Sequence, residues 1–517
     1  MRKIHILLLV PVIFTLFFLF LPLQSKSEMP ASHVALIPLD SRPCNTDYIF
    51  YVCGAIGKTI TLPHEGLDHY TDPSNPEKLY EFLYDSLSEN DTYLIYTNQL
   101  LNGGLIASRD PRSYDNLEEK LDEFELFLKE ARSQNKQVAV ISVVPRVLPS
   151  QFTELWKYAS ELLAFSAQYG QLSLAEETVA KNHAPPEIIR EYMSIYEGSD
   201  QIVERMKALV EEEAIDLFII GQDDTHPESI NNQYIHKYLG YDHPQIVVQP
   251  GADELTKLVL ARFLREESDH HPLNLNLVYT HPEASDAIKT FEAFSTSERM
   301  AQMLTFLSLT PDKESDNITI IHNDRDFGEQ TLKNLEIHRQ AKYLSLIDTA
   351  YINRADARLF ETFTFINRID GYSGWNTVGN AIGTELANFV IHDYLNRTLA
   401  TYPPEQREKM LANYYMLQYI HYADDYLYQS QLRDKLNLFL RDQGQDTTRI
   451  TDTLMANRYL ANLFTQKSDV INNSFPGEYY RFGQSFRIHQ VSGDIYLPWE
   501  RTFEAAIVPD LSVELIN

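Results

Sequence analysis

The sequence predicts an α/β protein with a (β/α)8, TIM-barrel-like core, followed by a C-terminal helical and small β extension. Two patterns indicate the core. Short runs rich in β-branched and aromatic residues alternate with longer amphipathic segments, as strands and helices do in a parallel sheet. The short runs are apolar along most of their length, which is typical of strands buried on both faces. An open doubly wound parallel sheet is the alternative.

Nine runs before residue 400 have the length and composition of strands. They are His33–Asp40, Thr92–Asn98, Gln137–Val144, Asp216–Gln222, Gln245–Gly251, Leu275–His281, Asn317–Asn323, Lys342–Asp348 and Thr362–Asp370. Helical spacing is clear between them, for example over Asn116–Gln134 and Ser199–Ala214. A closed barrel needs eight strands, so we expect one of the nine runs to be false or accessory.

Past residue 400 the pattern changes, which predicts a C-terminal extension. Residues 403–443 have the spacing of one or two aromatic-rich helices, and residues 478–515 read as short strands. The predicted domains are a signal peptide or N-terminal anchor over 1–27, a barrel-like catalytic domain over 28–400, a helical extension over 401–470 and a small β-rich tail over 471–517.

The N-terminus has the layout of a secretory signal. Arg2 and Lys3 precede an apolar stretch from Ile6 to Leu23, and a polar segment follows it. The apolar stretch is nearly long enough to span a bilayer, so residues 6–23 are either removed or kept as a membrane attachment. We therefore expect a protein that is secreted or anchored on the outer face of the cytoplasmic membrane.

Composition limits the partners and the redox chemistry. The chain has 44 Lys plus Arg against 73 Asp plus Glu, a formal net charge of -29, without a long basic run. A nucleic-acid backbone would be repelled, so no nucleic-acid partner is expected. The two cysteines, Cys44 and Cys53, are predicted to be free thiols, although an exported protein permits a disulfide.

Two adjacent carboxylates, Asp223 and Asp224, directly follow the apolar run Asp216–Gln222. A single Asp at such a place is ordinary capping or turn chemistry, and this stays open as an alternative for the pair. Neighbouring like charges repel, which raises the pKa of one of them. Because a carboxylic acid that keeps its proton near neutral pH can donate it in catalysis, Asp223 and Asp224 are the predicted catalytic residues.

Polar residues also follow the other predicted strands. The carboxyl ends of parallel strands lie on the face where α/β folds build their sites, so we expect these side chains to converge and bind substrate. A cap, a turn or a core position is the simpler alternative for each. The predicted substrate-binding residues are Asp40, Arg42, Asn45, Arg109, Asp253, Glu254, Trp375, Asn376 and Asn380.

Six motifs along the chain resemble one bacterial family. They are ALIPLDSRPCN, NGGLIASR, GQDD, PGADE, GWNTVGNAIGTE and LPWERTFE, in this order between residues 34 and 507. The family is catalogued as a domain of unknown function with the hallmarks IPLDxRPxN and GWNTxGNxxG. The resemblance implies membership and no particular reaction.

The Asp pair also resembles the acid pair of retaining, substrate-assisted N-acetylhexosaminidases, which follows the fourth barrel strand. This resemblance implies that the 2-acetamido oxygen of the sugar attacks the anomeric carbon, while Asp223 orients the acetamido group and Asp224 protonates the leaving oxygen. Side chains alternate along a strand, so adjacent residues cannot easily flank one bond as a separate nucleophile and acid. The substrate-assisted mechanism avoids that requirement.

The sequence thus favours an extracellular glycoside hydrolase that acts on N-acetylhexosamine-containing glycans without a cofactor. Two alternatives stay open. One is a divalent-metal-dependent hydrolase, although no compact ligand motif is present. The other is a non-catalytic protein that binds cell-wall glycan through aromatic residues. In the metal-dependent alternative the ligands would be Asp223, Asp224, His226, Asp253 and Glu254.

Overall fold

Parallel strands form two separate sheets in the computed structural model, which describes residues 33–171, 184–241, 243–268, 270–360 and 368–516. The strand order is β2-β1-β3-β4-β5-β6 in the first sheet and β11-β10-β9-β7-β8 in the second. Every pairing in both sheets is parallel. The first sheet contains β1 (His33–Ile37), β2 (Thr59–Thr61), β3 (Thr92–Tyr96), β4 (Gln137–Val144), β5 (Leu217–Gln222) and β6 (Ile246–Val248). The second contains β7 (Asn274–Tyr279), β8 (Thr310–Pro311), β9 (Asn317–His322), β10 (Tyr343–Asp348) and β11 (Gly371–Ser373).

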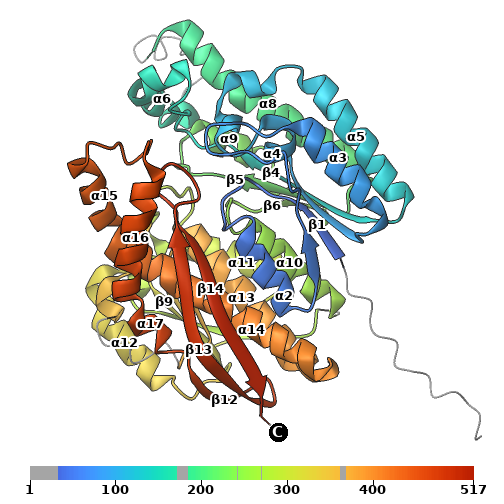
Figure 1. Ribbon diagram of the computed structural model, residues 1–517. Helices are drawn as coiled ribbons and strands as arrows, with labels where there is room; N and C mark the ends of the chain where they lie inside the picture. Colours follow the sequence, from blue (N-terminus) through green and yellow to red (C-terminus); the bar gives the residue numbers. More distant parts are fainter. Residues whose placement is uncertain (1–32, 172–183, 242, 269, 361–367, 517) are drawn as a thin grey trace, which may run out of the picture. The chain divides into compact units, whose positions relative to one another are not determined.

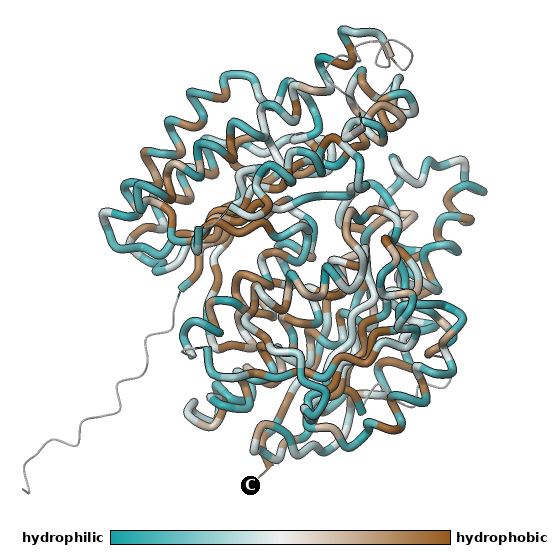
Figure 2. The backbone as a smooth tube through the Cα atoms, turned by 180° about the vertical axis from the view of Figure 1, so that it is seen from behind, coloured by the Kyte–Doolittle hydropathy of each residue, from teal (hydrophilic) through white to brown (hydrophobic). Residues whose placement is uncertain are grey.

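Helices cover both faces of the first sheet (Figure 1). Along β1, Val34 and Leu36 share an apolar cluster with α2 and α10, whereas Ala35 and Ile37 share another with α3, α5 and α8. Since successive strand residues point to opposite faces, both faces must be apolar. Figure 2 shows these strands as a hydrophobic band between more hydrophilic helices. The helices are α2 (Asp47–Ala55), α3 (Pro76–Asp85), α5 (Leu117–Ser133), α8 (Pro186–Glu211) and α10 (Leu255–Glu267).

This arrangement confirms the predicted α/β class and corrects its geometry. In a barrel one face of every strand points inward and packs against the other strands. In the first sheet here, helices cover both faces, and α2 and α10 pack on the face that contains Val34 and Leu36. The described strands form two open sheets. In the first sheet β2 is added on one side of β1, and β3 and the later strands are added on the other side, as in doubly wound sheets. Continuous apolar strands occur both in barrels and in open sheets that helices cover on both faces. The nine predicted runs suggested a single barrel, but their strands belong to two different sheets.

Eight of the nine predicted runs contain strands, namely β1, β3, β4, β5, β6, β7, β9 and β10. The ninth run, Thr362–Asp370, lies largely outside the described residues. The short strands β2, β8 and β11 were not predicted because two or three residues carry no period. Helix α13 (Val378–Thr398) packs on β10 and β11 and also on α10, so it links the two sheets. Further helices are α4 (Thr97–Asn102), α6 (Ala159–Ser166), α9 (Ile230–His236), α11 (Thr296–Phe306) and α12 (Gly328–Ile337).

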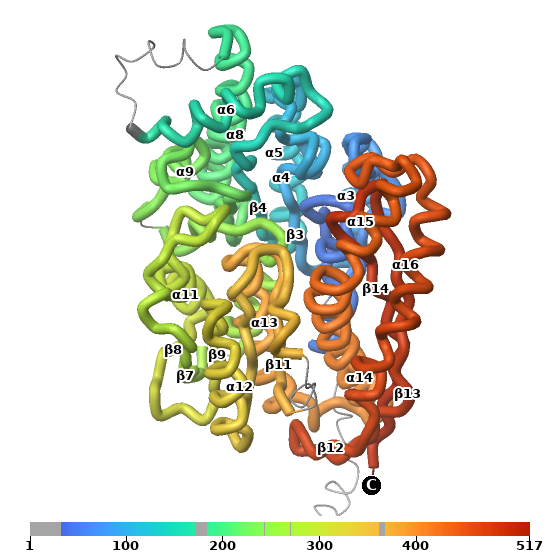
Figure 3. The backbone as a smooth tube through the Cα atoms, turned by 90° about the vertical axis from the view of Figure 1, so that its left-hand side faces the viewer, coloured from blue at the N-terminus to red at the C-terminus, as the bar shows by residue number. Residues whose placement is uncertain are grey.

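The C-terminal part contains the predicted helices and β-rich tail. Helix α14 (Pro404–His421) runs through a π-helix, Tyr422–Leu432, into α15 (Arg433–Asp442), and α16 (Thr453–Lys467) and α17 (Asp469–Asn472) follow. An antiparallel sheet then forms from β12 (Gly477–Arg481), β13 (Gln484–Tyr496) and β14 (Ala506–Leu515). In Figure 3, α14 and α16 lie beside this sheet, and α14 also contacts α2. Residues from His33 onward form one unit, and the domain limits within it stay a prediction.

Two further predictions concern the N-terminus and the cysteines. The apolar stretch Ile6–Leu23 lies outside the described residues. Within the described ranges, none of the helices is both long and apolar enough to cross a bilayer. Cys44 and Cys53 are free thiols, as predicted.

Candidate functional site

Residues that follow β1 and β6 form a buried charged network. The Arg42 guanidinium donates from Nε to Asp40 Oδ2 at 2.9 Å and from Nη2 to Asp253 Oδ1 at 2.5 Å. Asn45 Nδ2 donates to Asp40 Oδ1 at 2.9 Å and to Asp253 Oδ1 at 3.1 Å. Each of these residues is at most 7 % exposed. The network lies next to the point where the strand order reverses, which is where open α/β sheets bind ligands.

Asn376 joins this network from the second sheet. It follows β11, and its Nδ2 donates to Asp253 Oδ2 at 3.4 Å. Asp253 therefore accepts hydrogen bonds from residues on both sides of the junction between the sheets. This contact places the GWNT motif against the IPLDSRPCN and PGADE motifs.

Arg146 holds both members of the Asp pair. It follows β4 and donates to Asp223 in a bidentate manner, from Nε at 2.8 Å and from Nη2 at 2.9 Å. Its Nη1 lies 2.8 Å from Asp224 Oδ2. Arg146 was not among the predicted site residues. Its position could have been inferred, since Arg146 follows β4 and the Asp pair follows β5. These strands are parallel neighbours, so their carboxyl ends lie together.

The two neighbouring carboxylates have different protonation behaviour. Burial would raise the pKa of Asp223, but the charge and hydrogen bonds of Arg146 lower it below its ordinary value. Burial raises the pKa of Asp224 to about 6, and the charge of Asp223 adds to this while Arg146 opposes it. The Asp223 side chain is 5 % exposed and that of Asp224 is 18 % exposed. The more accessible acid, Asp224, therefore keeps its proton to a higher pH than Asp223 does.

Arg109 lies near this pair as a buried cation. It is 9 % exposed, and its Nε donates to the Leu105 carbonyl at 3.3 Å. Burial and repulsion from Arg146 lower the pKa of Arg109 to about 9, against the attraction of Asp223 and Asp224. Within the part of the chain that the structure describes, Arg109 has no carboxylate at ion-pair distance. It is available to bind a polar group of a ligand beside the Asp pair.

Glu254 lies apart from these hydrogen bonds. It precedes α10, and its Oε2 accepts from the backbone N–H of Ala252 at 3.2 Å. Burial raises the pKa of Glu254 to about 7, although Arg299 favours its charged form. Its other oxygen, Oε1, is buried without a hydrogen-bond partner among the described residues. Substrate binding by Glu254 stays a prediction.

Trp375 and Asn380 line a small cavity of about 30 Å³ together with Asp253. Other walls come from α10 and the π-helix, whose residues were absent from our sequence-based site. The sequence feature that could have indicated them is the pair of adjacent acids in YADDYLY, which lies inside a helical pattern. This segment forms the π-helix, and π-helices are frequent at functional sites. The additional lining residues are Cys44, Tyr48, Lys257, Thr384, Ile420, His421, Asp424 and Asp425.

The residues of the metal-dependent alternative do not gather into a ligand shell. Arg146 binds Asp223 and Asp224, Arg42 binds Asp253, and His226 is exposed. Among the described residues, there is no group of three or more His, Cys, Asp or Glu side chains that could hold a metal ion.

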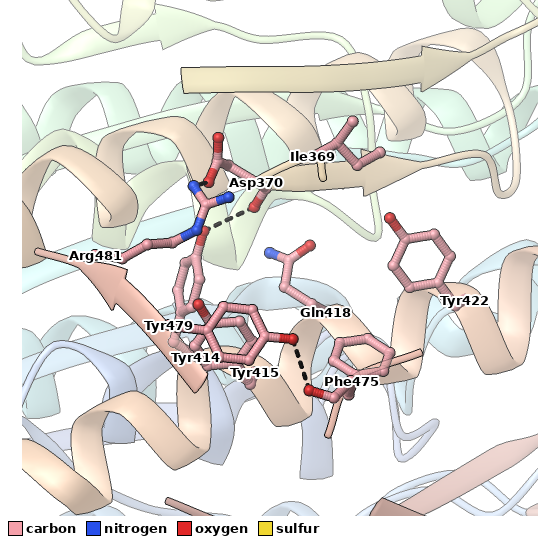
Figure 4. A pocket seen from close by; sticks show the side chains of 9 residues that line it. All are labelled: Ile369, Asp370, Tyr414, Tyr415, Gln418, Tyr422, Phe475, Tyr479 and Arg481. Atoms are coloured by element: carbon pink, nitrogen blue, oxygen red, sulfur yellow. Dashed lines mark hydrogen bonds and ion pairs between the residues drawn. The ribbon is translucent and has the colours of Figure 1, made fainter. Parts of the chain in front are cut away.

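A second cavity lies between α14 and the C-terminal sheet (Figure 4). Its charged residues, Arg481 and Asp370, pair with each other. The Tyr414 hydroxyl donates to the Asp370 carbonyl at 2.7 Å and that of Tyr479 to the Phe475 carbonyl at 2.6 Å. Through Asp370, which precedes β11, these contacts join β12 to α14. None of the predicted site residues lines this cavity.

Comparisons with known proteins give a family and no activity. No curated protein matches the chain. One solved structure, the ligand-free cyclic α-maltosyl-(1→6)-maltose hydrolase from Arthrobacter globiformis, is 11 % identical with a TM-score of 0.20, over 73 % of this chain and 84 % of that one. A TM-score of 0.20 does not define a shared arrangement of elements. The family model described as "Protein of unknown function (DUF4127)" matches residues 34–508, and the chain therefore belongs to this family, as its motifs indicated.

Proposed function

We propose that this protein is a glycoside hydrolase in which Asp224 is the general acid. The observation that carries the proposal is the unequal environment of two adjacent carboxylates. Arg146 lowers the pKa of Asp223, whereas burial raises that of Asp224 to about 6. A pair in which one carboxyl group is ionised while the other keeps its proton up to about pH 6 suits acid-assisted cleavage of a glycosidic bond.

Asp223 retains capacity for one more hydrogen bond. Its Oδ1 accepts from Arg146 Nη2 and from the Asp224 backbone N–H at 2.8 Å, and its Oδ2 accepts from Arg146 Nε. A carboxylate has about four acceptor positions, so one stays open on Oδ2. An acetamido N–H of the substrate would fit this acceptor, which favours an N-acetylhexosamine at the cleavage point.

The proposed reaction has two steps. The 2-acetamido oxygen attacks the anomeric carbon, and Asp224 gives its proton to the departing glycosidic oxygen. In the second step Asp224 removes a proton from water, which attacks the same carbon and releases the acetamido group. Asp223 stays ionised throughout and stabilises the positive charge that develops on the acetamido nitrogen. Arg109 and Asn376 are the groups that would bind sugar hydroxyls nearby.

The test is release of aryl leaving groups from β-linked N-acetylglucosaminides, N-acetylgalactosaminides and glucosides by the full chain. We expect turnover of the acetamido sugars, little of the glucoside, and no loss in EDTA. Asp224→Ala should be at least about a hundredfold slower and partly rescued by a good leaving group. Asp223→Asn should be slow with every leaving group.

The controls separate the alternatives. Arg112→Met changes an exposed arginine outside the site and should leave turnover intact. Activity that returns only with added metal would replace the proposal by metal-dependent hydrolysis. Sugar binding without turnover would identify the non-catalytic alternative.

A further inference from the structure

Lys257 is a buried cation without a direct partner. It lies on α10, is 5 % exposed, and lines the cavity that contains Trp375 and Asn380. Burial lowers the pKa of Lys257, while the charges of Asp425 and Asp424 act in the opposite direction. In the described part of the chain, no carboxylate lies within ion-pair distance of its ammonium group, and no acceptor is hydrogen-bonded to it. Its donors are free to bind a ligand in the cavity.

Other buried polar atoms around this cavity also lack protein partners. They are Trp375 Nε1, Asn380 Oδ1 and His421 Nε2, where the absence of a partner refers to the described residues. Asn380 is 8 % exposed and His421 is 5 % exposed. Since nearly all buried polar groups are hydrogen-bonded, three such atoms in one cavity point to a ligand that supplies both donors and acceptors.

The charges select a neutral ligand. Burial and the charge of Asp425 raise the pKa of Asp424 well above its ordinary value, which favours its neutral form. Asp425 accepts from the Gly374 backbone N–H at 2.8 Å. An anion would meet Asp425 and Asp253, and a cation would meet Lys257. A hydroxyl group both donates and accepts, so it matches this mixed lining.

The size of the cavity limits how much of the ligand enters. A water-sized group needs roughly 10–15 Å³ of such space, so about 30 Å³ accommodates two neighbouring hydroxyl groups. A complete sugar ring does not fit behind them. A ligand anchored here would therefore end in the cavity.

We propose that the cavity lined by Lys257, Trp375 and Asn380 binds two neighbouring hydroxyl groups of the terminal sugar, and that cleavage is consequently restricted to chain ends. This inference rests on the proposed glycosidase function. Lys257 and Trp375 would donate to the hydroxyl oxygens, and Asn380 and Asp425 would accept from the hydroxyl hydrogens. Lys257 is thus a specificity residue and takes no part in proton transfer.

The experiment measures binding apart from turnover. The full chain with Asp224→Asn is titrated by calorimetry with methyl N-acetyl-β-glucosaminide and its 3-, 4- and 6-deoxy analogues. We expect at least one deoxy analogue to bind about tenfold or more weakly, as loss of a charge-assisted hydrogen bond predicts. Adding Lys257→Met should weaken the parent sugar similarly and abolish the difference between parent and deoxy analogue. Lys467→Met, an exposed lysine on α16, is the matched control and should change neither.

Each outcome separates this inference from the proposed function. A deoxy effect that Lys257→Met removes, without any turnover by the unaltered chain, supports the cavity and overturns the glycosidase. Turnover with equal binding of all analogues and unchanged KM in Lys257→Met overturns the cavity and leaves the glycosidase. Internal cleavage of a chitin oligosaccharide would also contradict the restriction to chain ends. If Lys257→Met unfolds, Asn380→Ala provides the same comparison from the other side of the cavity.

Discussion

At the scale of single residues, Arg146 decides how the two acids differ. One guanidinium binds Asp223 through two nitrogens and Asp224 through the third. Because the bidentate contact belongs to Asp223, the same cation lowers the pKa of Asp223 despite its deeper burial, whereas the pKa of Asp224 is raised to about 6. The difference between chemically identical neighbours therefore comes from geometry.

The first prediction concerns Arg146→Met. Loss of this cation removes the attraction that lowers the pKa of Asp224, so the descending limb of kcat against pH should move upward by about one unit or more. Arg146→Lys should shift it less, because a charge stays but the bidentate contact is lost. The pH–rate profile with an aryl N-acetylhexosaminide measures both, and an unmoved limb in Arg146→Met would sink the assignment of Asp224.

The second prediction concerns Asp253→Asn. Asp253 accepts from Arg42, Asn45 and Asn376, and the substitution leaves a buried guanidinium with Asp40 alone. We expect a loss of about 3 kcal/mol of unfolding free energy. Glu336→Gln, which breaks exposed ion pairs with Arg339 and Arg368, should cost at most about 1 kcal/mol. Urea denaturation at pH 7 compares the two, and equal losses would contradict a structural role for the network.

At the scale of elements, helix α13 carries a buried acid against β10. Glu385 is fully buried and hydrogen-bonded by the Tyr343 hydroxyl, and burial raises the pKa of Glu385 to about 7. Between its ordinary pKa near 4.5 and about 7, the folded chain holds a proton that the unfolded chain has lost. The stabilisation from this group is complete below the unfolded pKa and disappears as the pH rises through 7.

The third prediction follows from this sign. Stability of the unaltered chain should fall between pH 5 and pH 8, and Glu385→Gln should remove a part of this slope on the order of 3 kcal/mol. The measurement is the difference in unfolding free energy between the two chains at each pH, since other groups titrate in both. Parallel curves would show that Glu385 does not hold its proton in the folded state.

The sequence could predict elements better than their assembly. Strands such as β4 and β5 are long apolar runs, so their positions followed from composition and period. The same pattern could not distinguish a barrel from an open sheet. Val34 and Ala35 point to opposite faces of β1, and both are buried whether a face packs against strands or against helices. A pattern of apolar residues reports burial and not the partner that buries them.

At the scale of the whole molecule, the parts of the site that lie on one sheet were predictable, whereas those that depend on packing between distant elements were not. The predicted cluster of Asp40, Arg42, Asn45 and Asp253 forms because strand ends of one parallel sheet lie together. Lys257 and Asp424 escaped prediction because they lie inside helices, and only the tertiary fold brings α10 and the π-helix to the same cavity. Periodicity places a residue on its own element but does not say which distant element faces it.

The last prediction concerns cooperativity of the whole chain. One apolar cluster extends from Val34 on β1 to Val513 on β14 and includes strands of both parallel sheets. The C-terminal part also hydrogen-bonds to residues that follow β1: Trp499 Nε1 donates to Ser41 Oγ at 3.0 Å, and the hydroxyl of Tyr48 on α2 accepts from the Ile507 N–H at 3.0 Å. Removing the elements after α13 would expose this shared core to water.

We therefore expect a single unfolding transition for the intact chain and no stable fold for a chain that ends at residue 402. Calorimetry gives the first result, because a two-state transition has equal calorimetric and van't Hoff enthalpies. Circular dichroism and protease resistance of the shortened chain give the second, with deletion of the last two residues, 516–517, as the control. A shortened chain that melts cooperatively would instead establish an independent domain ending near residue 400, and the contacts of Trp499 and Tyr48 would then join two domains that fold separately.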